Sequence, residues 1–212
     1  MIQRVFIILF SLLFVFSFAQ NKQKHMKSPM NERVEINKNF KLISLNNRIS
    51  KFPFSQATQV KIISYNLNFR GYHIPDPPKL DTASLKKYYE NIKKPIVLSI
   101  LMENNDNKGV QQSKVLTLSE ISEVSNILYN TCGKYYLKNR MGNKCFFPRN
   151  AILFYDENNE IFAYLDICFE CSGIEFFPED ISESIDTCEF IYPELENFFK
   201  SKGLITEYTQ EK

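Results

Sequence analysis

The chain has 212 residues, of which 44% are hydrophobic, so a domain with a buried core is expected. Only six glycines are present, which disfavours sites built on glycine-rich phosphate-binding loops. The formal net charge is +2, but residues 20–150 carry 22 Lys and Arg against 9 Asp and Glu, and residues 151–212 carry 3 against 15. Because charge alone informs on solubility and association, we interpret the two segments as solvated or mutually facing surfaces.

The first 19 residues are typical of a secretory signal peptide. Arg4 supplies the positive charge, residues 5–18 form a 14-residue run with serine as its only polar residue, and Ser17-Phe18-Ala19 fits a small-x-small cleavage site. A membrane-spanning helix needs about 20 apolar residues, so a retained N-terminal anchor is the less favoured alternative. Cleavage after Ala19 would leave 193 residues (212 − 19) in the periplasm or outside the cell.

Residues 20–56 are expected to form a polar tail and an irregular lead-in, followed by a single domain at 57–212. The alternating pattern of residues 60–69 predicts a strand, and Pro75-Asp-Pro-Pro78 interrupts regular structure. A helix is predicted from Asp81 to the residues before Pro95. The aliphatic run 95–103 then predicts a buried strand.

A further strand is predicted at 110–116, followed by the clearest helix of the chain. Thr117 and Glu120 form a capping box ahead of an apolar run, and Gly133 stands where a glycine commonly ends a helix. The buried face of this helix is expected to carry Leu118, Ile121, Val124, Ile127 and Leu128, with Cys132 near its end.

Residues 151–155 and 160–169 are predicted to form a β-hairpin around the polar loop 156–159. The odd-numbered residues of the second strand are all apolar and the even-numbered ones are mixed, which indicates one buried and one partly open face. A last helix is predicted from about Pro193 to Gly203. Together these elements predict an α+β domain, with an antiparallel sheet that includes the C-terminal hairpin and is packed by two or three helices.

The hairpin loop allows two registers. A four-residue loop places Arg149 opposite Asp166, whereas a two-residue loop shifts the pairing by two residues. In either register Cys145 approaches the end of the second strand. We therefore predict that Cys145 lies within disulfide reach of Cys168 or Cys171.

The cysteine count bears on the redox state of the chain. An exported protein favours disulfides over free thiols and thiolate–metal sites. Five cysteines leave at least one thiol unpaired within a monomer. Cys132, on the inner face of its helix, is the expected buried free thiol, and a Cys132–Cys188 disulfide is the alternative arrangement.

Two other chemistries are open to the same cysteines. Cys168-x-x-Cys171 has the spacing of a redox centre, although Glu170 and other acidic neighbours would raise a thiol pKa and weaken the nucleophile. Cys145 together with these two cysteines and Cys188 offers four sulfur ligands for zinc. Structural zinc sites usually use two close-spaced pairs of ligands, and only one such pair exists here.

Catalytic motifs of common hydrolases are not found in the sequence, which has neither G-x-S-x-G nor H-E-x-x-H. His25 and His73 are both expected in exposed loops. Arg149, Asp166 and Glu170 would share the open face of the hairpin, where cross-strand pairing is a simpler interpretation than an enzyme site. We expect no cofactor, no metal and no nucleic-acid partner.

The hairpin also carries a sequence motif, C-x-x-P-R-N-A-I followed by I-C-F-E-C, between Cys145 and Cys171. This motif resembles one found in small uncharacterised bacterial proteins that often have export signals. The resemblance is confined to this part of the chain. It implies an exported protein and implies no particular activity.

The sequence therefore favours an exported cell-envelope protein that is a disulfide-stabilised binding or structural module without catalysis, with another envelope protein as candidate partner. The alternative is a thiol redox or zinc-binding site built from Cys145, Cys168 and Cys171. No stretch after residue 19 is long and apolar enough to span a membrane, so the mature chain is expected to have no transmembrane segment.

Overall fold

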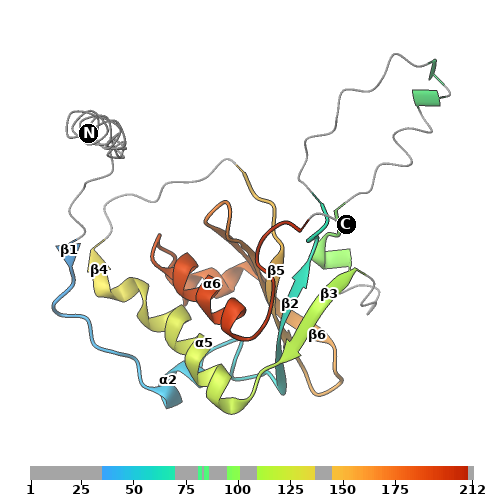
Figure 1. Ribbon diagram of the computed structural model, residues 1–212. Coiled ribbons are helices and arrows are strands. Elements are labelled where there is room, and N and C mark those ends of the chain that lie inside the picture. The colour runs from blue at the N-terminus through green and yellow to red at the C-terminus, as the bar shows by residue number, and fades with distance from the viewer. Residues whose placement is uncertain are drawn as a thin grey trace, which may run out of the picture. The chain divides into compact units, whose positions relative to one another are not determined.

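Figure 1 shows the computed structural model of the chain, which describes residues 35–69, 81–82, 84–85, 95–100, 109–136 and 145–209. The chain from Val34 to Lys212 forms one compact unit, which begins well before the predicted boundary at residue 57. The predicted signal peptide and most of the helix predicted from Asp81 lie outside the described residues.

The centre of this unit is a five-stranded antiparallel sheet with the strand order β3-β2-β5-β6-β7. Its interior strands β5 and β6 form the predicted C-terminal hairpin. The antiparallel sheet together with the helices confirms the predicted α+β class. The strands of the sheet are β2 (Gln59–Tyr65), β3 (Val110–Val115), β5 (Asn150–Tyr155), β6 (Ile161–Cys168) and β7 (Gly173–Phe177).

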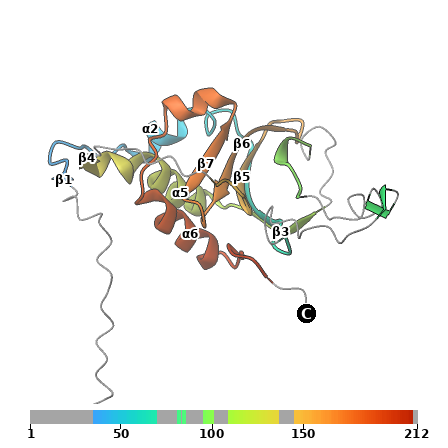
Figure 2. The same cartoon turned by 90° about the horizontal axis from the view of Figure 1, so that it is seen from above.

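Two helices cover one face of the sheet, as the view in Figure 2 shows. They are α5 (Leu118–Asn130) and α6 (Ile191–Ser201). A short helix, α2, packs against α5, and two short strands, β1 and β4, pair with each other. The remaining elements are β1 (Glu35–Ile36), α2 (Leu45–Ile49), β4 (Tyr135–Tyr136) and the 3-10 turns η1 (Cys132–Lys134) and η2 (Glu179–Glu183).

The sheet face beneath α5 and α6 holds the largest apolar core. Fully burying an aliphatic or aromatic side chain stabilises a fold by roughly 1.5–3 kcal/mol, so this face is a main source of stability. The core joins Ile62, Ile152, Phe154, Leu165 and Ile167 from the strands to Val124, Leu128, Leu195 and Phe199 from the helices.

The opposite face of the sheet carries a smaller core, to which residues 95–100 contribute. Leu98 packs there with Ile63, but residues 98–100 are helical, so the predicted strand at 95–103 is wrong for the residues described. The side chain of Asn66 accepts from the Ile96 N–H (2.9 Å) and donates to the Ile96 carbonyl (3.0 Å). The Asn66 amide thus bonds the N–H and the carbonyl of Ile96, which a neighbouring strand would bond in a sheet.

The segment before residue 57, predicted to be irregular, is tied to α5 by the buried side chain of Arg48. Its Nη1 donates to the carbonyl oxygen of Ile43 (2.6 Å) and its Nε donates to Ser125 Oγ (3.1 Å). Phe54 is also buried, in the main core. This segment therefore belongs to the domain, because Arg48 and Phe54 are buried in it.

The capping box predicted for α5 is present: the Glu120 N–H donates to Thr117 Oγ1 (3.3 Å) and the Thr117 N–H donates to Glu120 Oε2 (2.9 Å). Leu118, predicted to be buried, is 85% exposed because it lies in the first turn, outside the core. Gly133 is not a left-handed helix end, since the chain continues into η1. A Cβ at Gly133 would lie 2.2 Å from the Phe40 ring, so close approach explains the glycine.

The β5–β6 hairpin adopts the second of the two predicted registers, with Ala151 opposite Asp166. The register shifts between Phe154 and Tyr155, so a bulge connects the regular part of the ladder to the loop. The first register, which placed Arg149 opposite Asp166, is therefore wrong. A bulge of this kind is not visible in the alternation of polar and apolar residues.

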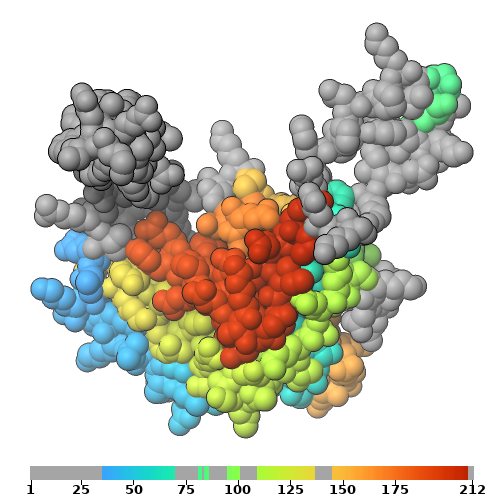
Figure 3. Space-filling view, viewed as in Figure 1, coloured from blue at the N-terminus to red at the C-terminus, as the bar shows by residue number. Residues whose placement is uncertain are grey.

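After α6 the chain turns at Gly203, whose φ of +83° is in the left-handed region, and residues 204–209 then lie along the sheet. The carbonyl oxygen of Ile205 accepts from Ser64 Oγ (2.8 Å) and from Asn150 Nδ2 (2.9 Å). In the space-filling view of Figure 3, α6 and this segment occupy the centre of the face, with α5 beside them. The C-terminal segment is thus part of the folded domain.

Candidate functional site

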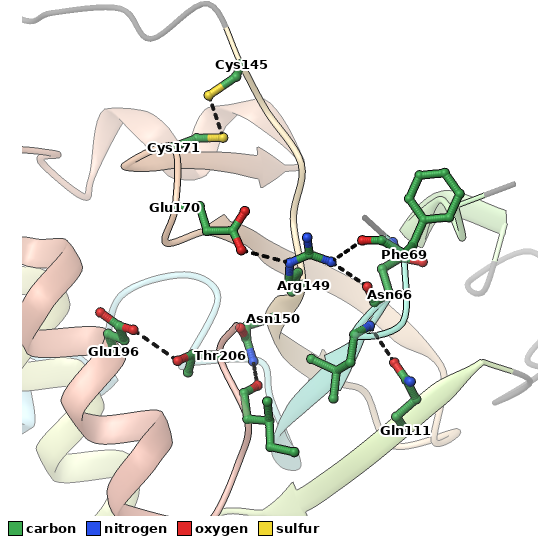
Figure 4. Close-up of polar contacts among 12 residues, drawn as sticks. Asn66, Phe69, Gln111, Cys145, Arg149, Asn150, Glu170, Cys171, Glu196 and Thr206 are labelled. Atoms are coloured by element: carbon green, nitrogen blue, oxygen red, sulfur yellow. Dashed lines mark hydrogen bonds and ion pairs between the residues drawn. The ribbon is translucent and has the colours of Figure 1, made fainter. Parts of the chain in front are cut away.

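Three cysteines meet at the end of the β5–β6 hairpin, and we refer to Cys145, Cys168 and Cys171 as the thiol cluster. Cys145 precedes β5, Cys168 ends β6, and Cys171 lies in the turn before β7. The Sγ atoms of Cys145 and Cys171 are 2.7 Å apart, as Figure 4 shows. The predicted proximity of Cys145 to this turn is therefore present, and Cys171 is the contacting partner.

The thiol cluster is partly covered by aromatic rings. Cys168 and Cys171 are buried together with Phe147, and the rings of Phe147 and Phe69 stack with their centroids 5.2 Å apart. Cys145 is exposed. The cluster therefore has one thiol that solvent can reach and two thiols that the protein covers.

The surroundings raise the pKa of two of these thiols. For Cys145 the main cause is the hydrogen bond with the Cys171 thiol, followed by burial, and the charge of Glu170 acts in the same direction. Burial is the main cause of the raised pKa of Cys171. Because the thiolate is the nucleophile, a raised pKa lowers the reactive fraction at neutral pH.

The remaining two cysteines form a disulfide that joins η1, directly after α5, to the chain before α6. Cys132 and Cys188 are 56 residues apart in sequence, and their Cα atoms are 5.6 Å apart. The expectation of a free thiol at Cys132 is wrong, and the alternative pairing is present. Helical spacing placed Cys132 correctly on the inner face, but no local pattern indicates a partner so distant in sequence.

A metal site is not assembled from the described residues, among which no group of three or more His, Cys, Asp and Glu side chains is arranged to hold an ion. Cys188, considered as a fourth zinc ligand, is bonded to Cys132. His25 and His73 lie outside the described residues.

Arg149 is only 4% exposed and connects the hairpin to the chain after β2. Its Nη1 donates to the carbonyl oxygens of Asn66 (2.5 Å) and Phe69 (2.7 Å), and its Nε donates to Glu170 Oε1 (3.3 Å), as Figure 4 shows. The guanidinium also lies 4.8 Å from the centre of the Phe147 ring. The structure brings Arg149 and Glu170 together. The other contacts of Arg149 are with two backbone carbonyls and the Phe147 ring.

Asp166, predicted on an open face, is buried with 6% exposure and pairs with Tyr65 instead of Arg149. The hydroxyl of the fully buried Tyr65 donates to Asp166 Oδ1. Burial raises the pKa of Asp166 to about 7, the Tyr65 hydrogen bond opposes this shift, and the charge of Glu175 adds to it. Asp166 is therefore neither opposite Arg149 nor on an open surface.

Sequence reasoning missed three polar residues that position this region. The strand prediction for residues 60–69 singles out neither Ser64 nor Tyr65, and the hairpin prediction does not single out Asn150. The available signal was an uncharged polar side chain within an apolar strand, because the large majority of such groups, when buried, have hydrogen-bond partners. Asn150 Nδ2 donates to Ser64 Oγ (3.0 Å), whereas Asn150 Oδ1 is buried without a partner among the groups described.

In the described part of the chain, no helix has both the length and the apolar character needed to cross a membrane. Comparison with known proteins identifies no relative: no protein-family model, no curated protein and no solved structure matches the chain.

Proposed function

We propose that the chain is an exported cell-envelope protein that acts as a disulfide-stabilised binding or structural module and not as an enzyme. The observation that carries this proposal is the disulfide between Cys132 and Cys188, which links two distant parts of the core. Protein disulfides persist mainly in oxidising compartments outside the cytoplasm. The signal-like character of the first 19 residues supports the same location.

The contact between Cys145 and Cys171 adds to this support. Their separation of 2.7 Å is longer than a disulfide bond of about 2.05 Å, so a small movement would allow the bond to form. We infer that the two thiols become a second disulfide after export. In that step an external disulfide is reduced to two thiols, because it accepts two electrons and two protons from Cys145 and Cys171.

The contacts of the polar hairpin residues favour a module over an enzyme. Arg149 binds two backbone carbonyls and Glu170, and Asp166 binds Tyr65. Both side chains are buried. Each of them therefore connects separate parts of the fold, and a substrate could bind it only by displacing these contacts.

A second candidate function is a thiol redox site at the thiol cluster, favoured by the Cys145–Cys171 contact and by the exposure of Cys145. The raised pKa values of both thiols count against it, because they reduce the thiolate fraction. Assay of the reduced protein with a protein disulfide substrate such as insulin separates the two functions. Turnover that is lost in Cys145→Ser would favour the redox site.

Cell fractionation with intact-mass and N-terminal analysis tests the proposed location. We expect a chain that begins at Gln20 and is found in the periplasm or medium. Its mass should be lower than that of the fully reduced chain by the four hydrogens lost when two disulfides form. A Leu12→Arg variant is the matched control, because a charge in the apolar run should block export. A wild-type chain that retains Met1 and stays in the cytoplasm with free thiols would contradict the proposal.

A further inference from the structure

Closure of the Cys145–Cys171 bond would leave Cys168 as the one thiol of the thiol cluster that is not oxidised. We propose that Cys168 is an alternative partner for Cys171, so that the disulfide exchanges between two positions and Cys145 becomes a site of reversible modification by low-molecular-weight disulfides. This inference rests on the proposed function, because it requires the cluster to be oxidised.

The arrangement of the three sulfurs is the first support. Cys171 contacts Cys145 at 2.7 Å, and Cys168 and Cys171 pack in the same buried cluster. Cys168 and Cys171 have the C-x-x-C spacing at which disulfides are known to form. Cys171 thus has two thiol neighbours, and it can be bonded to only one of them at a time.

The difference in exposure between the three residues is the second support. Cys168 is 1% exposed and Cys171 is 5% exposed, whereas Cys145 lies at the surface. With Cys145 bonded to Cys171, the remaining thiol is the buried Cys168. With Cys168 bonded to Cys171, the remaining thiol is the exposed Cys145. The position of the disulfide therefore decides whether solvent meets a thiol.

The surrounding contacts hold the cysteines close during such an exchange. The Glu170 side chain, between the two cysteines of the turn, accepts from Arg149 Nε at 3.3 Å. The turn itself is closed by the Ser172 N–H, which donates to the carbonyl oxygen of Phe169 at 3.2 Å. These two contacts fix the turn that carries Cys171, the cysteine shared by both positions of the disulfide.

The exchange conserves electrons. The Cys168 thiolate attacks Cys171 Sγ, a Cys168–Cys171 bond forms, and the Cys145–Cys171 bond breaks with its electron pair on Cys145. Cys168 has released one proton to water and Cys145 can take one up. The Cys145 thiolate then attacks an external disulfide, forms a mixed disulfide with one half, and releases the other half as a thiolate.

The test uses the oxidised mature protein and glutathione disulfide as the probe, with acid quenching, alkylation and peptide mapping. We expect glutathione on Cys145 in the same molecules that carry a Cys168–Cys171 disulfide. In Cys168→Ala the alternative partner is missing, so labelling of Cys145 should fall by at least about tenfold. Cys168→Ser provides a second variant if alanine disturbs the folding of this buried position.

The outcomes separate the two proposals. If mapping before the probe finds Cys145 bonded to Cys171, but the probe never labels Cys145 or labels it equally without Cys168, the exchange is refuted and the second disulfide stands. If mapping finds all three cluster thiols free before the probe, the proposed oxidation fails and the exchange fails with it. If neither Cys168 variant folds, the wild-type map still tests the exchange, because glutathione on Cys145 without a Cys168–Cys171 disulfide would refute it.

Discussion

Two charged residues of the hairpin are buried, and their partners define their effect on the domain. Arg149 donates to backbone carbonyls and to Glu170, whereas Asp166 accepts from Tyr65. A buried charge is costly unless it is paired or neutralised. Arg149 is paired, whereas the pKa of Asp166 is raised to about 7. The two residues should therefore respond differently to substitution and to pH.

Asp166 should make the stability of the domain depend on pH. Its pKa in the fold is about 7, above the ordinary value of 3.8, so the folded state holds a proton that the unfolded state has lost. Stability therefore falls as pH rises from about 4 to about 7 and is level above that range. Asp166→Asn keeps an acceptor for Tyr65 without the charge, and should remove this slope.

The loss of stability in the wild type relative to Asp166→Asn should be on the order of 4 kcal/mol between pH 4 and pH 8, since one pKa unit corresponds to 1.36 kcal/mol. Urea unfolding at both pH values measures it. Glu175→Gln is the matched control, because removing this neighbouring charge should lower the pKa of Asp166 and reduce the slope. Identical slopes in the wild type and Asp166→Asn would contradict this account.

Arg149 should contribute to stability through its backbone contacts. Arg149→Met keeps an extended apolar side chain but removes the buried donor shared by the carbonyls of Asn66 and Phe69. Hydrogen bonds to a charged group contribute roughly 1.5–3 kcal/mol, so the free energy of unfolding should fall by about 3 kcal/mol. Glu170→Gln should change it by less than about 1 kcal/mol, because Glu170 is half-exposed. Similar small losses in both variants would show that the carbonyl contacts are not important.

At the scale of elements, α5 connects the sheet to the Cys132–Cys188 disulfide, and its start depends on the capping box. Thr117→Ala removes the acceptor of the Glu120 N–H and should lower the free energy of unfolding by about 1 kcal/mol. Leu118→Ala, at the next position, is the control: its side chain is 85% exposed, so a change within about 0.5 kcal/mol is expected. Thermal or urea unfolding of both variants checks this, and a larger loss for Leu118→Ala would be the opposite result.

The elements that sequence predicted correctly are those with local signals. The capping box located α5, and the alternation of residues around a polar loop located β5 and β6. Residues 95–103 were predicted as a strand because a short apolar run has the same appearance in a strand and in a helix. In the structure the side chain of Asn66, distant in sequence, bonds both backbone groups of Ile96, and the apolar run does not indicate this.

The candidate site was predictable in position and not in its pairings. The hairpin brought Cys145 toward Cys171 in either register, so this contact needed only a local argument. The bulge before Tyr155 selected the register, and with it the partner of Asp166, through backbone geometry that residue types do not indicate. The Cys132–Cys188 pair depends on the packing of α5 against α6, which is a property of the whole fold.

At the scale of the whole molecule, the Cys132–Cys188 disulfide closes a loop across 56 residues. The loop-entropy relation gives about 4 kcal/mol for a loop of this length, so Cys132→Ala/Cys188→Ala should lose about that much stability. Cys188→Ala alone should lose about as much, because either substitution removes the bond. Urea unfolding under non-reducing conditions measures the loss, and variants as stable as the wild type would rule out a stabilising disulfide.

The most direct test of an exported, disulfide-stabilised domain is non-reducing peptide mapping of the protein purified from its native compartment. The account predicts a Cys132–Cys188 peptide and a second disulfide at Cys171, chiefly with Cys145, with one thiol left per chain. If all five cysteines are instead alkylated without prior reduction, the chain is not disulfide-stabilised and the proposed function is wrong.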